Sequence, residues 1–175
     1  MIVLKNIYKL YDYCFNTLDD PRVQDLPLIN KPWLVIAIVV MYLYFVKYKG
    51  IEFMKSRQPF ELKKLIIFYN TIQIIGNFMC SSITLNHTYI QGGYSLSCEP
   101  IPKGDFIPSA LIVRNMCYMY FIGKVIDLLD TVFFILRKKN SQITFLHVYH
   151  HVLMVLSSYV FVKFYSAGGH PVSLG

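Results

Sequence analysis

Charged residues are scarce in this sequence. Asp, Glu, Lys and Arg make up only 15% of the 175 residues, whereas soluble domains carry about 25%. Cysteine is scarce too, and 4 Cys in a chain of this length exclude a small disulfide-framework protein. Hydrophobic residues reach 55% and the mean hydropathy is +0.44. This much apolar surface excludes an intrinsically disordered chain.

The apolar residues are clustered in four segments, each about long enough to cross a bilayer as a helix of roughly 20 residues. They cover about residues 33–48, 62–85, 110–136 and 143–165. A soluble domain of this size cannot bury four such segments, so the sequence predicts an all-α, polytopic transmembrane bundle. The predicted organisation is an N-terminal segment 1–31 without a removable signal peptide, a transmembrane region 32–165 and a tail 166–175.

The distribution of Lys and Arg predicts the orientation. Lys47, Lys49, Lys55, Arg57, Lys63 and Lys64 lie between or beside the first two segments, and Arg137, Lys138 and Lys139 lie between the last two. The connection 86–109 carries only Lys103. Basic loops face the cytosol, so we expect a non-cytosolic N-terminus. Because the basic residues flank the spans and line no single face, nucleic-acid binding is not predicted.

Ionisable residues inside the third segment mark a candidate site. Lys124, Asp127 and Asp130, followed by Thr131, occupy one arc of a helix at about 100° per residue. Lys124 and Asp127 have the spacing of an ion pair, which leaves Asp130 without a partner on its own helix. Charges within a span are costly and usually functional. The alternative interpretation is a structural ion pair that fixes helix packing.

The fourth segment carries His147, His150 and His151, whose spacing places three imidazoles on one helical face. At 1.5 Å per residue, Asp130 and His150 lie about 10 Å and about 12 Å from the basic turn between the segments. The sequence therefore predicts one polar site built from both helices. A zinc ion held by the histidines and Asp130 is one interpretation. Three histidines at this spacing do not converge readily on one ion, so metal-free acid–base or nucleophilic chemistry fits better.

These motifs resemble those of the ELO family of very-long-chain fatty acid elongases. KVIDLLDT at 124–131 is similar to the family's K-x-x-E-x-x-D-T motif, and DTVFFILRKKNSQITFLHVYHH at 130–151 is similar to the stretch that ends in its H-x-x-H-H box. Tyr69, Asn70, Gln73 and the segment 98–100 also fit the family's layout. Asp127 stands where the family usually has Glu. The family continues to seven spans, so a truncated or fragmentary chain with four spans is expected.

The resemblance implies an enzyme of the endoplasmic reticulum membrane, with the histidine box toward the cytosol. It would condense a long-chain acyl-CoA with malonyl-CoA to a 3-oxoacyl-CoA, with loss of CO₂ and CoA and without a cofactor or metal. His150 is the first choice for an acyl-carrying nucleophile, with Asp130 orienting an imidazole and His147 and His151 stabilising or protonating an enolate. The implied supporting ion pair is Lys124 with Asp127, and the candidate contacts for CoA phosphates are Arg137, Lys138 and Lys139.

Two other functions are compatible with the sequence. A non-catalytic truncated isoform would associate with full-length elongases, and a proton- or ion-translocating bundle would use the same intramembrane residues. The predicted partners are membrane lipids, the two CoA substrates, and homo- or hetero-oligomers with other enzymes of the elongation cycle.

Overall fold

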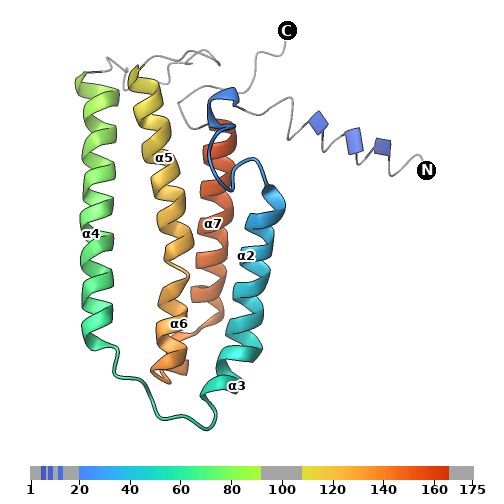
Figure 1. Ribbon diagram of the computed structural model, residues 1–175, viewed down its shortest axis with the longest axis vertical. Coiled ribbons are helices and arrows are strands. Elements are labelled where there is room, and N and C mark those ends of the chain that lie inside the picture. The colour runs from blue at the N-terminus through green and yellow to red at the C-terminus, as the bar shows by residue number, and fades with distance from the viewer. Residues whose placement is uncertain (1–4, 7, 10–11, 14–19, 92–107, 166–175) are drawn as a thin grey trace.

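The computed structural model describes residues 5–6, 8–9, 12–13, 20–91 and 108–165. Among these residues every regular element is helical and no strand occurs, so the predicted all-α fold class is confirmed. The long helices stand side by side as a bundle, with two chain reversals at one end (Figure 1). The predicted tail 166–175 and the loop residues 92–107 lie outside the described residues.

The first long helix is continuous from Pro32 to Met54. It consists of α2 (Pro32–Tyr44), a π-helical turn η3 (Phe45–Lys49) and α3 (Gly50–Met54). Proline at the start suits a helix because its fixed φ is already helical and its missing N–H would have no partner there. The helix continues beyond residue 48, where the sequence predicted the end of the first span.

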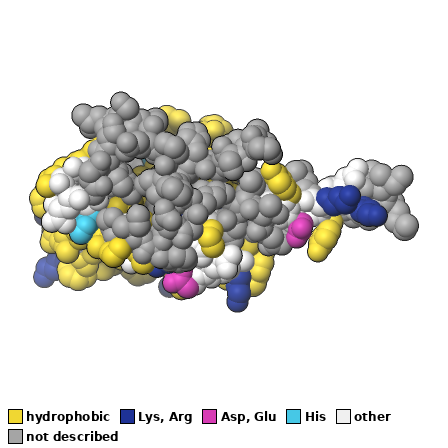
Figure 2. Space-filling view, turned by 90° about the horizontal axis from the view of Figure 1, so that it is seen from above, with side chains coloured by type: hydrophobic (Ala, Val, Ile, Leu, Met, Phe, Trp, Pro, Cys, Tyr) yellow, Lys and Arg dark blue, Asp and Glu magenta, His cyan; other side chains and the backbone are white. Residues whose placement is uncertain are grey.

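The second long helix, α4 (Lys63–Leu85), continues into a π-helical turn η4 (Asn86–Ile90). No side chain of α4 is buried, and its main lateral neighbour is α5. Large apolar side chains such as Phe68, Ile74 and Phe78 are therefore exposed. Figure 2 shows hydrophobic side chains along the edge of the molecule where α4 stands. An exposed apolar face of this kind marks a surface for lipid or protein.

The third expected span is interrupted. It forms α5 (Pro108–Ile126) and α6 (Leu129–Leu136), separated by a turn at residues 127–128. Around this turn Leu128 N–H donates to Val125 O (3.3 Å) and Asp130 N–H donates to Asp127 O (3.1 Å), so the bonds follow the tighter 3₁₀ pattern. The structure thus differs from the continuous helix expected over 110–136.

Within the described ranges, three helices are long and apolar enough to cross a membrane. They are Pro32–Met54, Lys63–Ile90 and Phe145–Tyr165, the last being α7. The interrupted pair α5–α6, which covers the third expected span, runs beside α7 (Figure 1).

The reversal between α6 and α7 lies at the same end of the bundle as the loop 55–62; we call this end the basic end. Lys138 has a left-handed φ of 55°, a conformation that commonly terminates helices. Its N–H donates to Ile135 O (2.9 Å), and Lys139 N–H donates to Phe134 O (2.8 Å). These two bonds satisfy carbonyls at the end of α6, and a short 3₁₀ turn η5 (Asn140–Gln142) then leads to α7.

The core lies between the first helix, the α5–α6 pair and α7. Its fully buried side chains include Val35, Phe121, Ile135 and Val155. At the end opposite the basic end, residues 20–30 close the bundle, and Tyr159 OH donates to Ile29 O (3.0 Å). The core thus holds α7 in the centre of the bundle.

Gly50 allows the first helix to approach α6 closely. A Cβ at this position would lie 3.0 Å from Phe45 O and 3.1 Å from Ile135 Cδ1, whereas a Cβ at Gly76 would meet nothing within 4 Å. We expect Gly50→Leu to destabilise the protein by about 1–3 kcal/mol, because overpacking forces the helices apart. Melting temperatures in detergent measure the effect, with Gly76→Leu as the matched control. Equal melting temperatures for the two variants would contradict the close approach.

Candidate polar site at the helix break

The break in the third helix holds the predicted ion pair. Lys124 Nζ lies 2.7 Å from Asp127 Oδ2, and the two side chains are 19% and 20% exposed. Gln73 of α4 donates a hydrogen bond from Nε2 to the other carboxylate oxygen of Asp127. The pair therefore joins α5 to α4, and both contacts of the Asp127 carboxylate lie at the break.

Tyr69, one turn before Gln73 on α4, lies on the other side of the break. Its hydroxyl donates to Ile126 O (3.4 Å), a carbonyl at the end of α5. The same hydroxyl is in hydrogen-bond contact with the carboxyl group of Asp130, and its ring packs edge-on against Phe133 at 5.3 Å. Asp130, which has no partner on its own helix, thus has one on α4.

Thr131 links the break to the histidines. Its side chain is fully buried, and Oγ1 lies 2.8 Å from Tyr42 OH and 3.0 Å from His147 Nε2. These two hydrogen bonds connect the first helix, α6 and α7. Because Tyr42 is itself buried, the chain Tyr42–Thr131–His147 fixes one imidazole in position.

The three histidines form one cluster, as their spacing predicts. The ring centroids of His147 and His151 are 4.4 Å apart, and those of His150 and His151 are 5.9 Å apart. Their surroundings differ, because His147 and His151 are half-buried and His150 is exposed. Among the described residues His150 forms no hydrogen bond. The N–H of His147 donates to Thr144 Oγ1 (3.1 Å), a side-chain cap that begins α7.

The acidic and histidine motifs meet as one polar layer, but in a specific pairing. Asp130 interacts electrostatically with His147, whereas Lys124 and Asp127 act on His151. Within the part of the chain that the structure describes, no three His, Cys, Asp or Glu side chains are arranged to hold a metal ion. The layer is thus a hydrogen-bonded cluster of carboxylates, imidazoles and hydroxyls.

The basic turn lies apart from this layer. Arg137 is half-buried at the end of α6, while Lys138 and Lys139 are exposed. Asp130 and Arg137 are seven residues apart, which corresponds to about 10 Å along a helix. The three basic residues of the turn therefore lie at the basic end of the bundle, outside the polar layer.

Tyr42 is the site residue that the sequence did not single out. Its segment reads as an apolar membrane span, and Tyr42 is one of 14 tyrosines. In the sequence, only the resemblance to the family's layout indicates Tyr69 and Gln73. The signal that was available for Tyr42 is its position among aliphatic residues in the middle of a span, where a buried hydroxyl needs a partner.

Comparison with known proteins identifies the family. The sequence profile described as "ELO: GNS1/SUR4 family" matches residues 27–174. The chain belongs to the ELO family. ELO membership together with the long apolar helices makes it a multi-pass membrane protein.

Individual relatives cover most of this chain but only part of their own length. Very long chain fatty acid elongase 7 of Rattus norvegicus is 41% identical over 151 residues, which are 86% of this chain and 52% of the relative. Very long chain fatty acid elongase 7 of Drosophila melanogaster is 39% identical over 159 residues, which are 89% of this chain and 46% of the relative. Very long chain fatty acid elongase 4 of Mus musculus is 38% identical over 152 residues, which are 87% of this chain and 48% of the relative. The chain thus spans about half the length of these ELO proteins.

The Tyr42–Thr131–His147 chain predicts a measurable coupling. Tyr42→Phe and Thr131→Val each remove one hydroxyl at nearly constant volume and leave the other partner unsatisfied. We expect each to cost about 1–3 kcal/mol, and the double variant to cost less than the sum by about 1 kcal/mol. Thermal denaturation in detergent measures the cycle. The Tyr118→Phe substitution, in a half-buried tyrosine of α5, serves as control, and additive effects of the two site variants would refute the link.

Proposed function

We propose that this chain carries the reaction centre of a fatty acid elongase. The reaction would condense a long-chain acyl-CoA with malonyl-CoA and yield a 3-oxoacyl-CoA, CO₂ and CoA. The observation that carries the proposal is the polar layer in which three clustered histidines and Asp130 meet between apolar helices. Relatives named as very long chain fatty acid elongases at 41% and 39% identity support it.

His150 is the proposed nucleophile. Its ring is exposed and free of hydrogen bonds to described residues, whereas Nε2 of His147 is held by Thr131. An imidazole nitrogen of His150 would attack the thioester carbonyl, and the C–S bond would break. CoA would leave as the thiolate, and the acyl group would remain bound to the His150 ring. His151, whose ring centroid lies 5.9 Å away, would accept the imidazole proton.

The second half of the reaction uses the remaining groups of the layer. Loss of CO₂ from malonyl-CoA leaves an enolate, whose carbon would attack the acyl-imidazole and release His150. Hydrogen-bond donors aimed at the developing negative charge stabilise such an intermediate. His147 suits this task because Asp130 and Thr131 fix its position. Lys124 and Asp127 would support the layer by holding α4 against the break.

An apolar cavity offers space for an acyl chain. It has a volume of about 490 Å³ and lies between α4 and α5, with lining residues that include Cys80, Thr84, Cys117, Tyr120 and Phe161. Lys124 Nζ lies 5.0 Å from the centroid of the Tyr120 ring, so one end of the cavity borders the polar layer. We assign the acyl chain to this cavity.

The CoA moiety would lie at the basic end. Arg137, Lys138 and Lys139 offer charged donors for its phosphates. Basic loops remain on the cytosolic side of membranes, so the proposal places this end in the cytosol and the N-terminus in the lumen of the endoplasmic reticulum. CoA substrates and the histidine layer would then meet on the same side.

A second candidate function is a non-catalytic subunit that associates with full-length elongases. The observation that favours it is α4, which has no buried side chain and exposes a long apolar face. Co-expression with an intact elongase, followed by affinity capture and measurement of acyl-chain lengths, tests it. Capture of the elongase, together with an elongation activity that His150→Ala in this chain leaves unchanged, would favour the subunit function over catalysis.

Substitution of the proposed nucleophile gives the decisive test. In microsomes that contain the protein, we expect His150→Ala to reduce malonyl-CoA incorporation by at least about 100-fold and to abolish the acyl-enzyme adduct seen by mass spectrometry. His87→Ala, outside the histidine box, is the matched control and should leave both readouts unchanged. Retention of the adduct in His150→Ala would assign the nucleophile elsewhere.

Removal of the carboxylate should have a different signature. Asp130→Asn keeps the size of the side chain but removes the charge that acts on His147. We expect the rate of condensation to fall about 100-fold or more, because a neutral amide no longer stabilises an imidazolium, while the adduct still accumulates. Asp25→Asn, an exposed carboxylate paired with Arg114 at the opposite end, is the control. An unchanged rate in Asp130→Asn would remove Asp130 from the mechanism.

A further inference from the structure

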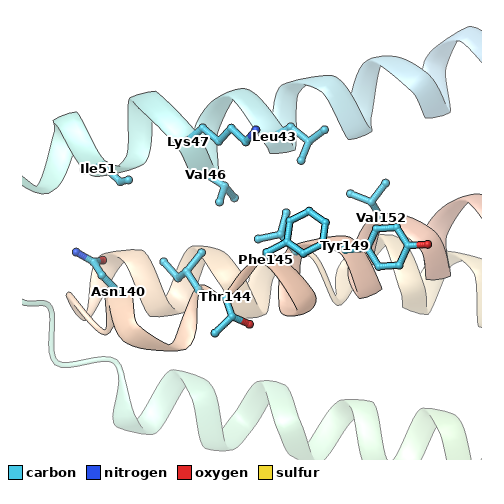
Figure 3. A pocket seen from close by; sticks show the side chains of 11 residues that line it. Leu43, Val46, Lys47, Ile51, Asn140, Thr144, Phe145, Tyr149 and Val152 are labelled. Atoms are coloured by element: carbon cyan, nitrogen blue, oxygen red, sulfur yellow. The ribbon is translucent and has the colours of Figure 1, made fainter.

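A second concave surface lies between the first helix and α7. This groove has a volume of about 580 Å³, within the range of about 300–1,000 Å³ typical of small-molecule sites. Figure 3 shows Leu43, Val46 and Ile51 of the first helix directed toward α7. Val148, Tyr149 and Val152 of α7 line the opposite wall. The groove is therefore apolar along most of its length.

The groove is distinct from the histidine site. Counting about 100° per residue from His147, Val148, Val152 and Tyr149 lie at about 100°, 140° and 200°. His150 and His151 lie at about 300° and 40° on the same scale. The two sets of residues thus lie on different faces of α7, and the lining of the groove includes none of the three histidines, Lys124, Asp127, Asp130 or Thr131.

One cation borders this apolar surface. Lys47 lines the groove and is exposed, and within the described ranges it takes part in no salt bridge. Glu52, the only acidic residue of the first long helix, pairs instead with Lys49 at 2.9 Å. A lysine near the end of a span extends to the headgroup region, where anionic groups are available to bind it. The groove therefore combines a long apolar wall with one uncompensated positive charge.

The local backbone supports this arrangement. Val46 and Lys47 belong to the π-helical turn η3, and such turns insert an extra residue into a helix and are frequent at functional sites. Asn140 of η5 lines the groove at the basic end and adds an amide donor. Figure 3 shows the Lys47 side chain directed along the first helix toward Leu43, away from Asn140. Asn140 lies at the basic end, where the headgroups of a bilayer leaflet would lie, and the long, flexible lysine side chain is able to turn toward that end.

We propose that the groove is a binding site for an anionic phospholipid of the surrounding bilayer. One acyl chain would lie against Leu43, Val46 and Val152, and the phosphate would bind Lys47 and Asn140. A soluble anion would leave the apolar walls exposed, and an uncharged lipid would leave Lys47 without a partner. The site goes beyond the proposed function and uses none of its residues.

Photolabelling of the purified protein in phosphatidylcholine vesicles tests the site. The probe is phosphatidic acid with a diazirine on its acyl chain, and the matched probe is phosphatidylcholine with the same chain. We expect the phosphatidic acid label on peptides that contain residues 43–51 and 145–152. Lys47→Gln should lower this label about fivefold, the effect of one basic residue near an anionic surface. Lys47→Arg and the exposed Lys64→Gln on α4 should retain it.

Three outcomes would overturn the site. Equal labelling of the groove by both probes, with no effect of Lys47→Gln, would show a non-specific apolar surface. Labels spread evenly over the exposed faces of α4 and α7 would show ordinary lipid contact. An unlabelled groove would show that protein, a second copy or another segment of the chain, covers it. Competition of wild-type labelling by unlabelled phosphatidic acid, and not by phosphatidylcholine or inorganic phosphate, supports the site without relying on a variant.

Discussion

Inside a membrane a backbone carbonyl has no water to bond, so an interrupted helix must satisfy its free groups from neighbouring side chains. The break at residues 127–128 imposes this constraint on the whole bundle. Tyr69 meets it by donating to Ile126 O, and the tight turn bonds of Leu128 and Asp130 meet the rest. α4 is therefore held beside the break by polar contacts, although it buries no apolar side chain of its own.

The same break sorts the polar groups of the third helix between two neighbours. Lys124 and Asp127, before and at the turn, are paired with each other, and Asp127 also accepts a hydrogen bond from Gln73 of α4. Thr131, after the turn, is bonded to His147 of α7 and to Tyr42 of the first helix. Asp127 and Thr131 thus each have a partner on a different helix, which satisfies polar groups in a low-dielectric interior. The network specifies how the helices are placed relative to one another, which apolar packing alone would leave less defined.

The sequence predicts the parts of this structure that depend on local pattern. Long apolar runs indicate the helices, the spacing of Lys124 and Asp127 indicates their ion pair, and the spacing of the histidines indicates their common face. The break could not be predicted, because KVIDLLDT contains no Gly or Pro and its interruption depends on groups of α4. The partners of Asp130 and Thr131 could not be predicted either, since Tyr69 and Tyr42 lie on helices whose rotation only the fold determines. The first helix continues to Met54, although Lys47 and Lys49 suggested an end near residue 48.

The rotation of α7 about its axis determines which of its side chains face each neighbouring helix. Two hydrogen bonds from α7 side chains to other elements fix this rotation, from His147 to Thr131 and from Tyr159 to Ile29 O. The two residues are twelve positions apart, or about 18 Å at 1.5 Å per residue, so the bonds hold the helix near both of its ends. With the rotation fixed, His150 lies about 60° around the helix from His147, beside the Thr131 contact but not in it, and Val148 and Val152 face the first helix. The position of the His150 imidazole and the apolar groove wall are thus two consequences of the same pair of hydrogen bonds.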